Sequence, residues 1–367
     1  LVGWAEYAEG FGAGGVTALL HRFAPIVAGL DPRQVRRITS MLQSITRLAA
    51  GGLNNQAIAA IENACLDIKA KALGVPVAAL FGGPFRERLP LYWSHCGSFR
   101  ARMPDLFEKW GKPRIETLAD ITTIAKEAVQ RGFRAVKTNP LSVAGGKLKM
   151  FEGGFRIHPG ILERNIDNRF IHDIENLLGA FRDGLGPDTG LMLDINFNQR
   201  TEGFLRIARA IEKFDPTWFE IDMHDASTLA HVRHETNVPI ASLESIHGLK
   251  NYRPYFEAQA ADVAVVDVPW NGLWESVRIA TLADAYEVNC APHNFYGDLA
   301  TLMSAHFCAA IPNFRIMEIE VDDVPWKSDL VTKAPVIENG ELIVPAGPGW
   351  GADINEEALK AYPAKGR

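Results

Sequence analysis

Six polar residues recur at regular intervals along the chain, each directly after a short apolar run. They are Asp194, Glu220, Glu244, Asp267, His293 and Glu318. Successive members lie 23 to 26 residues apart, the spacing of one strand–helix–strand unit. Any one of them could be a helix cap or a surface charge. Six in phase indicate side chains at the C-terminal ends of successive strands, the rim where barrel enzymes keep their active sites.

The first three residues of this series are carboxylates that follow three neighbouring predicted strands. A buried ring of carboxylates repels itself unless a cation lies among them. Oxygen ligands suit a hard ion, and few protein ligands with room for substrate favour Mg²⁺ over Ca²⁺. Zinc would require His or Cys ligands. We therefore expect Asp194, Glu220 and Glu244 to bind Mg²⁺.

Asp267 and His293 follow the next two predicted strands. A carboxylate beside an imidazole fixes its tautomer and raises its pKa, which gives an acid–base group that is useful near neutral pH. The alternative for His293 is an ordinary surface histidine. Glu318 would hydrogen-bond a substrate carboxylate oxygen if it is protonated.

Lys137 ends an earlier apolar run, and Asn139 points the same way because strand side chains alternate. A lysine crowded by a divalent cation has a lowered pKa, as a catalytic base requires. The alternative is a lysine that pairs with the carboxylate ring. Asn196 faces the same side as Asp194 and can hold a substrate hydroxyl or an enolate oxygen. The residues expected to bind substrate are Asn139, Asn196, His95 and Asn294, and Trp270 is a further candidate for specificity.

The elements that position these residues alternate between short apolar runs and amphipathic stretches. The strand candidates are 91–94, 135–137, 191–194, 218–220, 240–243, 263–267, 288–291 and 315–318, with helical patterns such as 117–131, 204–213 and 272–286 between them. This alternation predicts parallel strands with right-handed crossovers, and eight strands close a barrel. An open doubly wound sheet is the alternative, but the first candidate strand is followed by Cys96-Gly97-Ser98 and not by the Gly-rich phosphate turn.

Residues 1–88 differ in texture and predict a separate leading unit, ahead of a barrel over 89–320 and a C-terminal segment over 321–367. Residues 1–7 have a strand-like pattern, and 9–15 form a Gly-rich loop. Residues 54–73 predict a helix whose apolar face is Ile58, Ile61, Cys65, Ile68 and Ala72, and which ends at Gly74. The stretch 141–173 is too long for a plain loop, so we expect an active-site lid or an oligomer contact.

The composition limits the partners of the protein. The 367 residues carry a net charge of −6 with no basic run, so nucleic acid is not an expected partner. No apolar stretch approaches the roughly 20 residues that cross a bilayer, and residues 1–15 do not resemble a signal peptide. The four cysteines form no C-x-x-C pair, as expected of free cysteines in a reducing cytoplasm.

Several motifs resemble those of one known family. They are Gly3-Trp4-Ala5-Glu6, residues 60–69, Gly74-Val75-Pro76, residues 80–83, Asp194-Ile195-Asn196, Ala291-Pro292-His293-Asn294 and residues 345–351. With these motifs, which are specific jointly and weak singly, nearly the whole chain resembles the enolase superfamily in its mandelate racemase/muconate lactonizing enzyme-like branch, of the sugar-acid dehydratase type.

The resemblance implies a (β/α)₈ barrel with an N-terminal α+β capping domain that the C-terminal tail completes. It also implies that Asp194, Glu220 and Glu244 bind Mg²⁺, and that Asp267 and His293 form an acid–base dyad. It further implies that Glu318 meets the substrate carboxylate and that the loop 9–15 belongs to a mobile cap. We expect a homo-oligomer that acts on a small carboxylate.

The sequence departs from the family pattern in three places. The second barrel strand usually ends in Lys-x-Lys, where this chain has Lys137-Thr138-Asn139, which argues against a two-base racemisation. The segment after Glu220 lacks the common Glu-Pro and has Asp222 in that region. The chain also begins inside what would be the first sheet of the cap, so a preceding strand is expected.

These residues predict chemistry beside a carboxylate. The proton next to a carboxylate is very weakly acidic, and binding of the carboxylate to Mg²⁺ stabilises the enolate. With His293 as one strong acid–base group, we expect a dehydratase of an aldonic or aldaric acid that forms a 2-keto-3-deoxy acid. His293 would protonate the departing β-hydroxyl and would also take the α-proton if both leave from one face; Lys137 would otherwise be the base. The alternatives are a racemase or epimerase, a cycloisomerase, and a catalytically inert binding protein.

Overall fold

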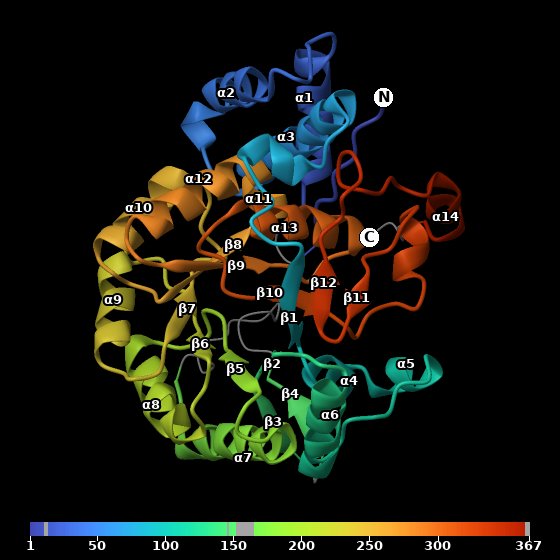
Figure 1. Cartoon of the computed structure of the whole chain (residues 1–367). Helices are drawn as coiled ribbons and strands as arrows, with labels where there is room; N and C mark the ends of the chain where they lie inside the picture. The colour runs from blue at the N-terminus through green and yellow to red at the C-terminus, as the bar shows by residue number, and fades with distance from the viewer. Residues whose placement is uncertain (11–13, 145–146, 152–164, 364–367) are drawn as a thin grey trace.

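The computed structural model describes residues 1–10, 14–144, 147–151 and 165–363 (Figure 1). A parallel barrel occupies the centre of this structure. Its strands are β1 (Arg88–Ser94), β2 (Ala135–Thr138), β5 (Gly190–Asp194), β6 (Trp218–Glu220), β7 (Ile240–Ser242), β8 (Val263–Asp267), β9 (Asn289–His293) and β10 (Met317–Glu320).

From β1 to β9, each barrel strand pairs with the next in parallel, and β10 pairs in parallel with β1. A parallel bridge between Cys290 and Phe314, just before β10, completes the circle. The predicted barrel is therefore confirmed, and the alternative of an open sheet is wrong. β6 and β8 have the predicted bounds, and the other strands differ by one to three residues at one or both ends.

Strand side chains alternate between the inside and the outside of the barrel. The inward ones form a small cluster of their own, in which the rings of Tyr92 and Trp218 meet edge to face at 5.5 Å. The outward ones join the large core between barrel and helices. The barrel is thus filled below its rim, and polar side chains gather where the strands end.

Helices surround the barrel (Figure 1). They are α4 (Ser98–Arg102), α5 (Pro104–Lys109), α6 (Leu118–Gln130), α7 (Asn168–Leu185), α8 (Thr201–Ile211), α9 (Ala226–His234), α10 (Leu249–Glu257), α11 (Val268–Asn271), α12 (Leu273–Asp284) and α13 (Asp298–Ala310). None of the described helices is long and apolar enough to span a membrane. The four cysteines are buried and free, as predicted.

The leading unit consists of α1 (Val16–Val27), α2 (Val35–Ile45) and α3 (Gly52–Leu73), which ends at Gly74 as predicted. The strand expected at residues 1–7 is wrong, because no strand among the described residues pairs with it. Side chains hold this segment instead: the Trp4 amide donates to Asp67 at 2.9 Å, and the Trp4 carbonyl accepts from the indole of Trp350.

The buried face of α3 differs from the predicted apolar face. Ile58 and Cys65 are buried, but Ala72 is exposed, and Glu62 and Asn63 are buried. The reason is that these polar side chains bind the N-terminus of α12. Glu62 accepts from the Trp274 amide at 2.9 Å, and Asn63 accepts from the Leu273 amide at 2.9 Å.

A second acidic residue of the leading unit makes the same kind of contact with the next helix. Glu6 accepts from the amides of Gly297 and Ala300, at 2.6 and 3.0 Å, at the N-terminus of α13. We call Glu6, Glu62 and Asn63 the helix latch. Helices α12 and α13 adjoin β9, so the latch contacts the frame around two site-bearing strands.

The C-terminal segment returns to the leading unit, as expected for a tail that completes the cap. Strands β11 (Ile337–Glu338) and β12 (Glu341–Ile343) extend the start of β1 in antiparallel fashion. Farther on, Gly349 bridges to Pro76, and the Trp350 amide donates to Asp67 at 3.1 Å. The domain division at residues 88 and 320 stays a prediction.

The insertion after β2 begins with a hairpin of β3 (Leu141–Ala144) and β4 (Lys147–Met150). Residues 152–164 of the insertion, like residues 11–13 of the Gly-rich loop, lie outside the described residues. Whether the insertion is a lid or an oligomer contact therefore stays a prediction.

Candidate active site

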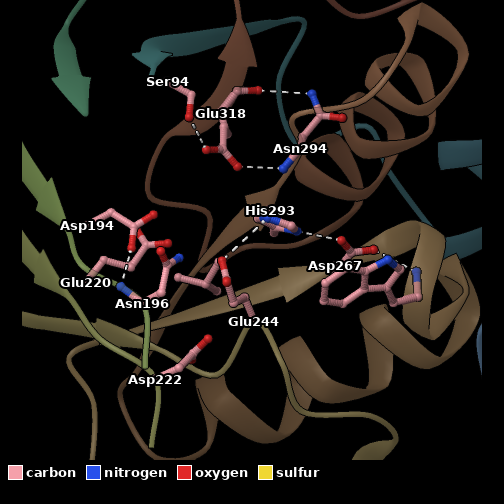
Figure 2. Close-up of polar contacts among 12 residues, drawn as sticks. Ser94, Asp194, Asn196, Glu220, Asp222, Glu244, Asp267, His293, Asn294 and Glu318 are labelled. Carbon is pink, nitrogen blue, oxygen red and sulfur yellow. Dashed lines mark hydrogen bonds and ion pairs between the residues drawn. The ribbon is translucent and has the colours of Figure 1, made fainter. Parts of the chain in front are cut away.

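The barrel brings the predicted polar residues together at the C-terminal ends of its strands (Figure 2). Those that are buried are Lys137, Asp194, Glu220, Asp267, His293 and Glu318. The side chain of Glu244 is 13% exposed. Several charges thus share one largely dehydrated pocket, where electrostatic interactions are stronger than in water.

Lys137 lies at the centre of the carboxylates. Its Nζ is 2.9 Å from Glu220 Oε1, 3.0 Å from Glu318 Oε1 and 3.6 Å from Asp194 Oδ2. Burial lowers the pKa of Lys137, but these carboxylates outweigh it and hold the pKa well above its usual range. This arrangement matches the alternative of a lysine paired with the carboxylate ring. The expectation that a divalent cation lowers the pKa of Lys137 stays a prediction.

His293 pairs with Asp267 as expected. His293 Nδ1 is 2.6 Å from Asp267 Oδ2, and His293 Nε2 is 3.5 Å from Glu244 Oε2. Asp267 is itself held, because it accepts from the Trp270 amide and from the Tyr296 hydroxyl. Burial lowers the pKa of His293, but Glu244 and Asp267 raise it to about 10. His293 is therefore a fixed imidazole and not a surface histidine.

Asp194, Glu220 and Glu244 face the same pocket but have different partners (Figure 2). Asp194 accepts from the Asn196 amide, Glu220 accepts from Lys137 and the Trp218 indole, and Glu244 lies beside His293. Across the described ranges, no three His, Cys, Asp or Glu side chains already form a group that could hold a metal ion. The three predicted ligands are neighbours, but they are not preassembled.

Asp222 is a site residue that the sequence reasoning did not assign. Its Oδ1 accepts from the Leu243 amide at 3.1 Å and from Ser242 Oγ at 3.4 Å, whereas its buried Oδ2 has no partner among the described residues. Asp222 lies two residues after Glu220. The strand alternation that linked Asn139 to Lys137 could therefore have found it.

The donor chemistry of this region fits a hard divalent cation. Burial raises the pKa of Glu220, Glu244 and Asp222, and neighbouring carboxylates raise it further. Such mutual repulsion, together with an unpartnered carboxylate oxygen on Asp222, is relieved by a cation with oxygen ligands.

Glu318 is held by contacts with three other residues of the site. It accepts hydrogen bonds from Ser94 Oγ at 2.5 Å and from the Asn294 amide at 2.6 Å, and it contacts Lys137. Burial raises the pKa of Glu318, but Lys137, His293 and these hydrogen bonds lower it to about 2. These contacts favour the ionised form of Glu318, and the expectation that Glu318 donates to a substrate carboxylate stays a prediction.

Two of the asparagines expected to bind substrate hydrogen-bond other residues of the protein instead. The Asn139 amide donates to the Asp194 carbonyl at 3.3 Å and accepts from Ser98 Oγ at 3.1 Å. The side-chain amide of Asn294 donates to Thr301 Oγ1 and to the Glu318 carbonyl. Both side chains are buried, so in this arrangement they position neighbouring groups and are not turned to a substrate.

The other two expected substrate contacts lie at the rim. Asn196 is half-buried, and its φ of 51° places it in the left-handed region, which asparagine tolerates better than most residues. His95 Nδ1 is 2.6 Å from Glu320 Oε2, and its side chain is 16% exposed. Both residues remain candidates for substrate contact.

Comparison with known proteins identifies the family. Residues 1–82 match the model for the mandelate racemase/muconate lactonizing enzyme N-terminal domain. Residues 120–358, more than half of the chain, match the model described as enolase C-terminal domain-like.

Individual relatives cover almost the whole chain. D-xylonate dehydratase of Haloferax volcanii is 29% identical over 98% of this chain and 82% of that protein. D-galactarolactone cycloisomerase of Agrobacterium fabrum is 26% identical over 94% and 84%. A crystal structure of a putative L-alanine-DL-glutamate epimerase from Burkholderia xenovorans, bound to magnesium and fumarate, superposes with a TM-score of 0.95, is 44% identical and covers 99% of this chain and 89% of that chain. This chain therefore belongs to the enolase superfamily, in its mandelate racemase/muconate lactonizing enzyme branch.

Proposed function

We propose that this protein is a Mg²⁺-dependent dehydratase of a sugar acid, which removes the proton next to the carboxylate and expels the β-hydroxyl to give a 2-keto-3-deoxy acid. The observation that carries the proposal is His293, an imidazole anchored by one carboxylate on Nδ1 and turned by Nε2 to a carboxylate-rich pocket. The relative named as a D-xylonate dehydratase supports the substrate class.

Asp194, Glu220 and Glu244 are the residues that would hold the metal ion. When bound, Mg²⁺ supplies Lewis-acid stabilisation of the charge that develops on the substrate carboxylate. The neighbouring structure that contains magnesium supports this assignment.

The protein groups divide the remaining work. Neutral His293 takes the α-proton at Nε2, because Asp267 holds its other nitrogen. A cation bound to Glu244 would offset the carboxylate charge that raises the pKa of His293, and so would favour this neutral form. Lys137, surrounded by three carboxylates, acts as a fixed positive charge beside the enolate and not as the base. Asn196 binds an oxygen of the substrate.

An epimerase is the second candidate. The 44% identical structure carries that name, and Lys137 and His293 approach the pocket from different strands, as a two-base exchange requires. Asn139, where the family usually has a second lysine, weighs against it, since its amide is buried in protein contacts.

One experiment separates these functions. The enzyme is incubated with Mg²⁺ in D₂O and a panel of four- to six-carbon aldonic and aldaric acids that includes D-xylonate. We expect a keto acid that reacts with semicarbazide, loss of activity in EDTA and recovery with Mg²⁺. Deuterium at Cα of recovered substrate without any keto acid would replace the dehydratase by an epimerase. No turnover and no Mg²⁺-dependent rise in unfolding temperature would indicate a catalytically inert binding protein.

A further inference from the structure

A second imidazole–carboxylate pair stands at the rim of the same barrel. His95 follows β1, and its Nδ1 is 2.6 Å from Oε2 of Glu320 at the end of β10. Glu320 lies two residues beyond Glu318, so both side chains point to the same side of the strand. His95 and Glu320 form an imidazole–carboxylate pair like that of His293 and Asp267. No step of the proposed mechanism uses His95 or Glu320.

Short contacts connect this pair to the site already described. Ser94 Oγ is 3.2 Å from His95 Nδ1 and 2.5 Å from Glu318 Oε1, the oxygen that contacts Lys137. The Phe295 ring is close to both imidazoles, with its centroid 6.1 Å from that of His95 and 5.0 Å from that of His293. The two histidines therefore contact the same aromatic ring at the rim of the barrel.

The His95 ring is held in a fixed orientation. It stacks on Phe99, with 4.1 Å between centroids and 13° between planes. Its backbone φ of 48° lies in the left-handed region, which a histidine adopts at a cost. Such strained residues persist where the surrounding structure enforces them, and they cluster at functional sites. Glu320 occupies Nδ1, which leaves Nε2 for proton exchange.

The strand order shows where His95 lies relative to the predicted metal ligands. The carboxylates Asp194, Glu220 and Glu244 follow β5, β6 and β7, and β10 and β1 lie across the barrel from them. If the substrate carboxylate binds on the acidic side, as the proposed function requires, Cα lies beside His293 and the carbon chain continues toward β10 and β1.

We infer that His95, held by Glu320, is the acid that protonates the departing β-hydroxyl, while His293 takes the α-proton. This inference rests on the proposed function. The Cα–H bond breaks and its proton passes to His293 Nε2. The Cβ–O bond breaks as His95 Nε2 delivers a proton, so that water leaves and a carbon–carbon double bond forms. Ketonisation of the resulting enol returns a proton to carbon from His293 and a proton from the enol hydroxyl to His95, which restores both residues.

The test separates proton abstraction from elimination. The wild-type protein, His95→Asn, Glu320→Gln and His293→Asn are each incubated in D₂O with Mg²⁺ and the acid from the panel that the wild type dehydrates fastest. Keto acid is measured with semicarbazide, and deuterium at Cα of recovered substrate is measured by NMR. His231→Asn, which changes an exposed histidine of α9, is the matched control.

We expect His95→Asn to form keto acid about a hundred-fold more slowly or worse, within the range of general acid catalysis, and to accumulate deuterium at Cα. Glu320→Gln should show the same pattern with a smaller loss, and His293→Asn should show neither product nor exchange. Retained exchange also demonstrates that His95→Asn is folded and binds substrate.

Dehydration by His95→Asn at a rate close to the wild type would overturn the inference and leave the proposed function intact. Loss of both exchange and elimination in His95→Asn would also overturn it, because His95 would then act before or during proton abstraction. A wild-type protein that dehydrates no member of the panel would instead remove the proposed function itself.

Discussion

Lys137 and His293 are two cationic groups in one carboxylate-rich pocket, and their surroundings differ in a way that separates their roles. Three carboxylates surround the Lys137 ammonium, so loss of its proton would leave them facing one another. His293 has one carboxylate on Nδ1 and one side of its ring directed to the pocket. We therefore expect Lys137 on β2 to act as a fixed cation and His293 on β9 to transfer protons.

The two groups also differ in what depends on them. If His293 is removed, Asp267 keeps its hydrogen bonds from the Trp270 amide and the Tyr296 hydroxyl. If Lys137 is removed, Asp194, Glu220 and Glu318 lose the cation that they share. Activity and stability should therefore respond differently on the two sides.

The largest effect on activity is expected for His293→Asn. Dehydration should fall by about a thousand-fold or more, because the acid–base group is lost while the shape of the ring site is retained. The free energy of unfolding, measured by urea denaturation, should change by less than about 1 kcal/mol, since Asp267 remains hydrogen-bonded. Activity within ten-fold of the wild type would remove His293 from the mechanism, and the proposed difference in role between His293 and Lys137 would be wrong.

Lys137→Met should reduce activity by about a hundred-fold, as the loss of one electrostatic contact to a developing charge does. It should also lower the free energy of unfolding by about 3 kcal/mol, because removal of one partner leaves buried carboxylates unpaired. Mg²⁺ should restore more stability to this variant than to the wild type, which thermal unfolding with and without EDTA would measure. Lys126→Met, on the exposed side of α6, is the control. Unchanged stability of Lys137→Met would contradict the view of Lys137 as a structural cation.

Tyr296→Phe should have the smallest effect. The Tyr296 hydroxyl shares Asp267 Oδ2 with His293 Nδ1, so its loss should loosen the carboxylate but leave the imidazole in place. We expect kcat to fall by less than about ten-fold with KM unchanged, in line with one hydrogen bond to a charged group. Tyr362→Phe, at an exposed tyrosine, is the control. A change confined to KM would indicate that Tyr296 contacts the substrate instead of orienting the dyad.

The sequence was most informative where a period could be followed. The apolar runs gave the barrel strands to within three residues, and the residues at their ends, Asp194 to Glu318, did gather at one rim. The prediction succeeds there because a parallel barrel repeats one strand–helix unit. Residues at the same place in successive units therefore lie at the same end of the barrel.

The sequence was less informative about what each side chain touches. Asn139 and Asn294 look like ligand contacts by position, but Ser98 and Thr301 occupy their amides. Glu318 was expected to be protonated, and only its contact with Lys137 shows why the ionised form is favoured. Contacts between distant segments decide such details, and no local pattern encodes them.

In the leading unit, too, contacts between distant segments decided what the sequence could not predict. The helical pattern of α3 could be read from its sequence. That Glu62 is buried and Ala72 is exposed depends on the backbone amides at the start of α12, more than two hundred residues away, which donate to Glu62. The strand expected at residues 1–7 failed for a related reason: an extended segment becomes a strand only beside another edge.

The helix latch has a consequence for how the enzyme can be inactivated. Glu6 and Glu62 accept hydrogen bonds from the first turns of α13 and α12, respectively. These two helices flank β9, the strand that ends in His293. Alignment of the imidazole with Asp267 is thus coupled to docking of a segment at the opposite end of the polypeptide. We therefore expect that loss of Glu6 or Glu62 reduces activity while the barrel itself stays folded.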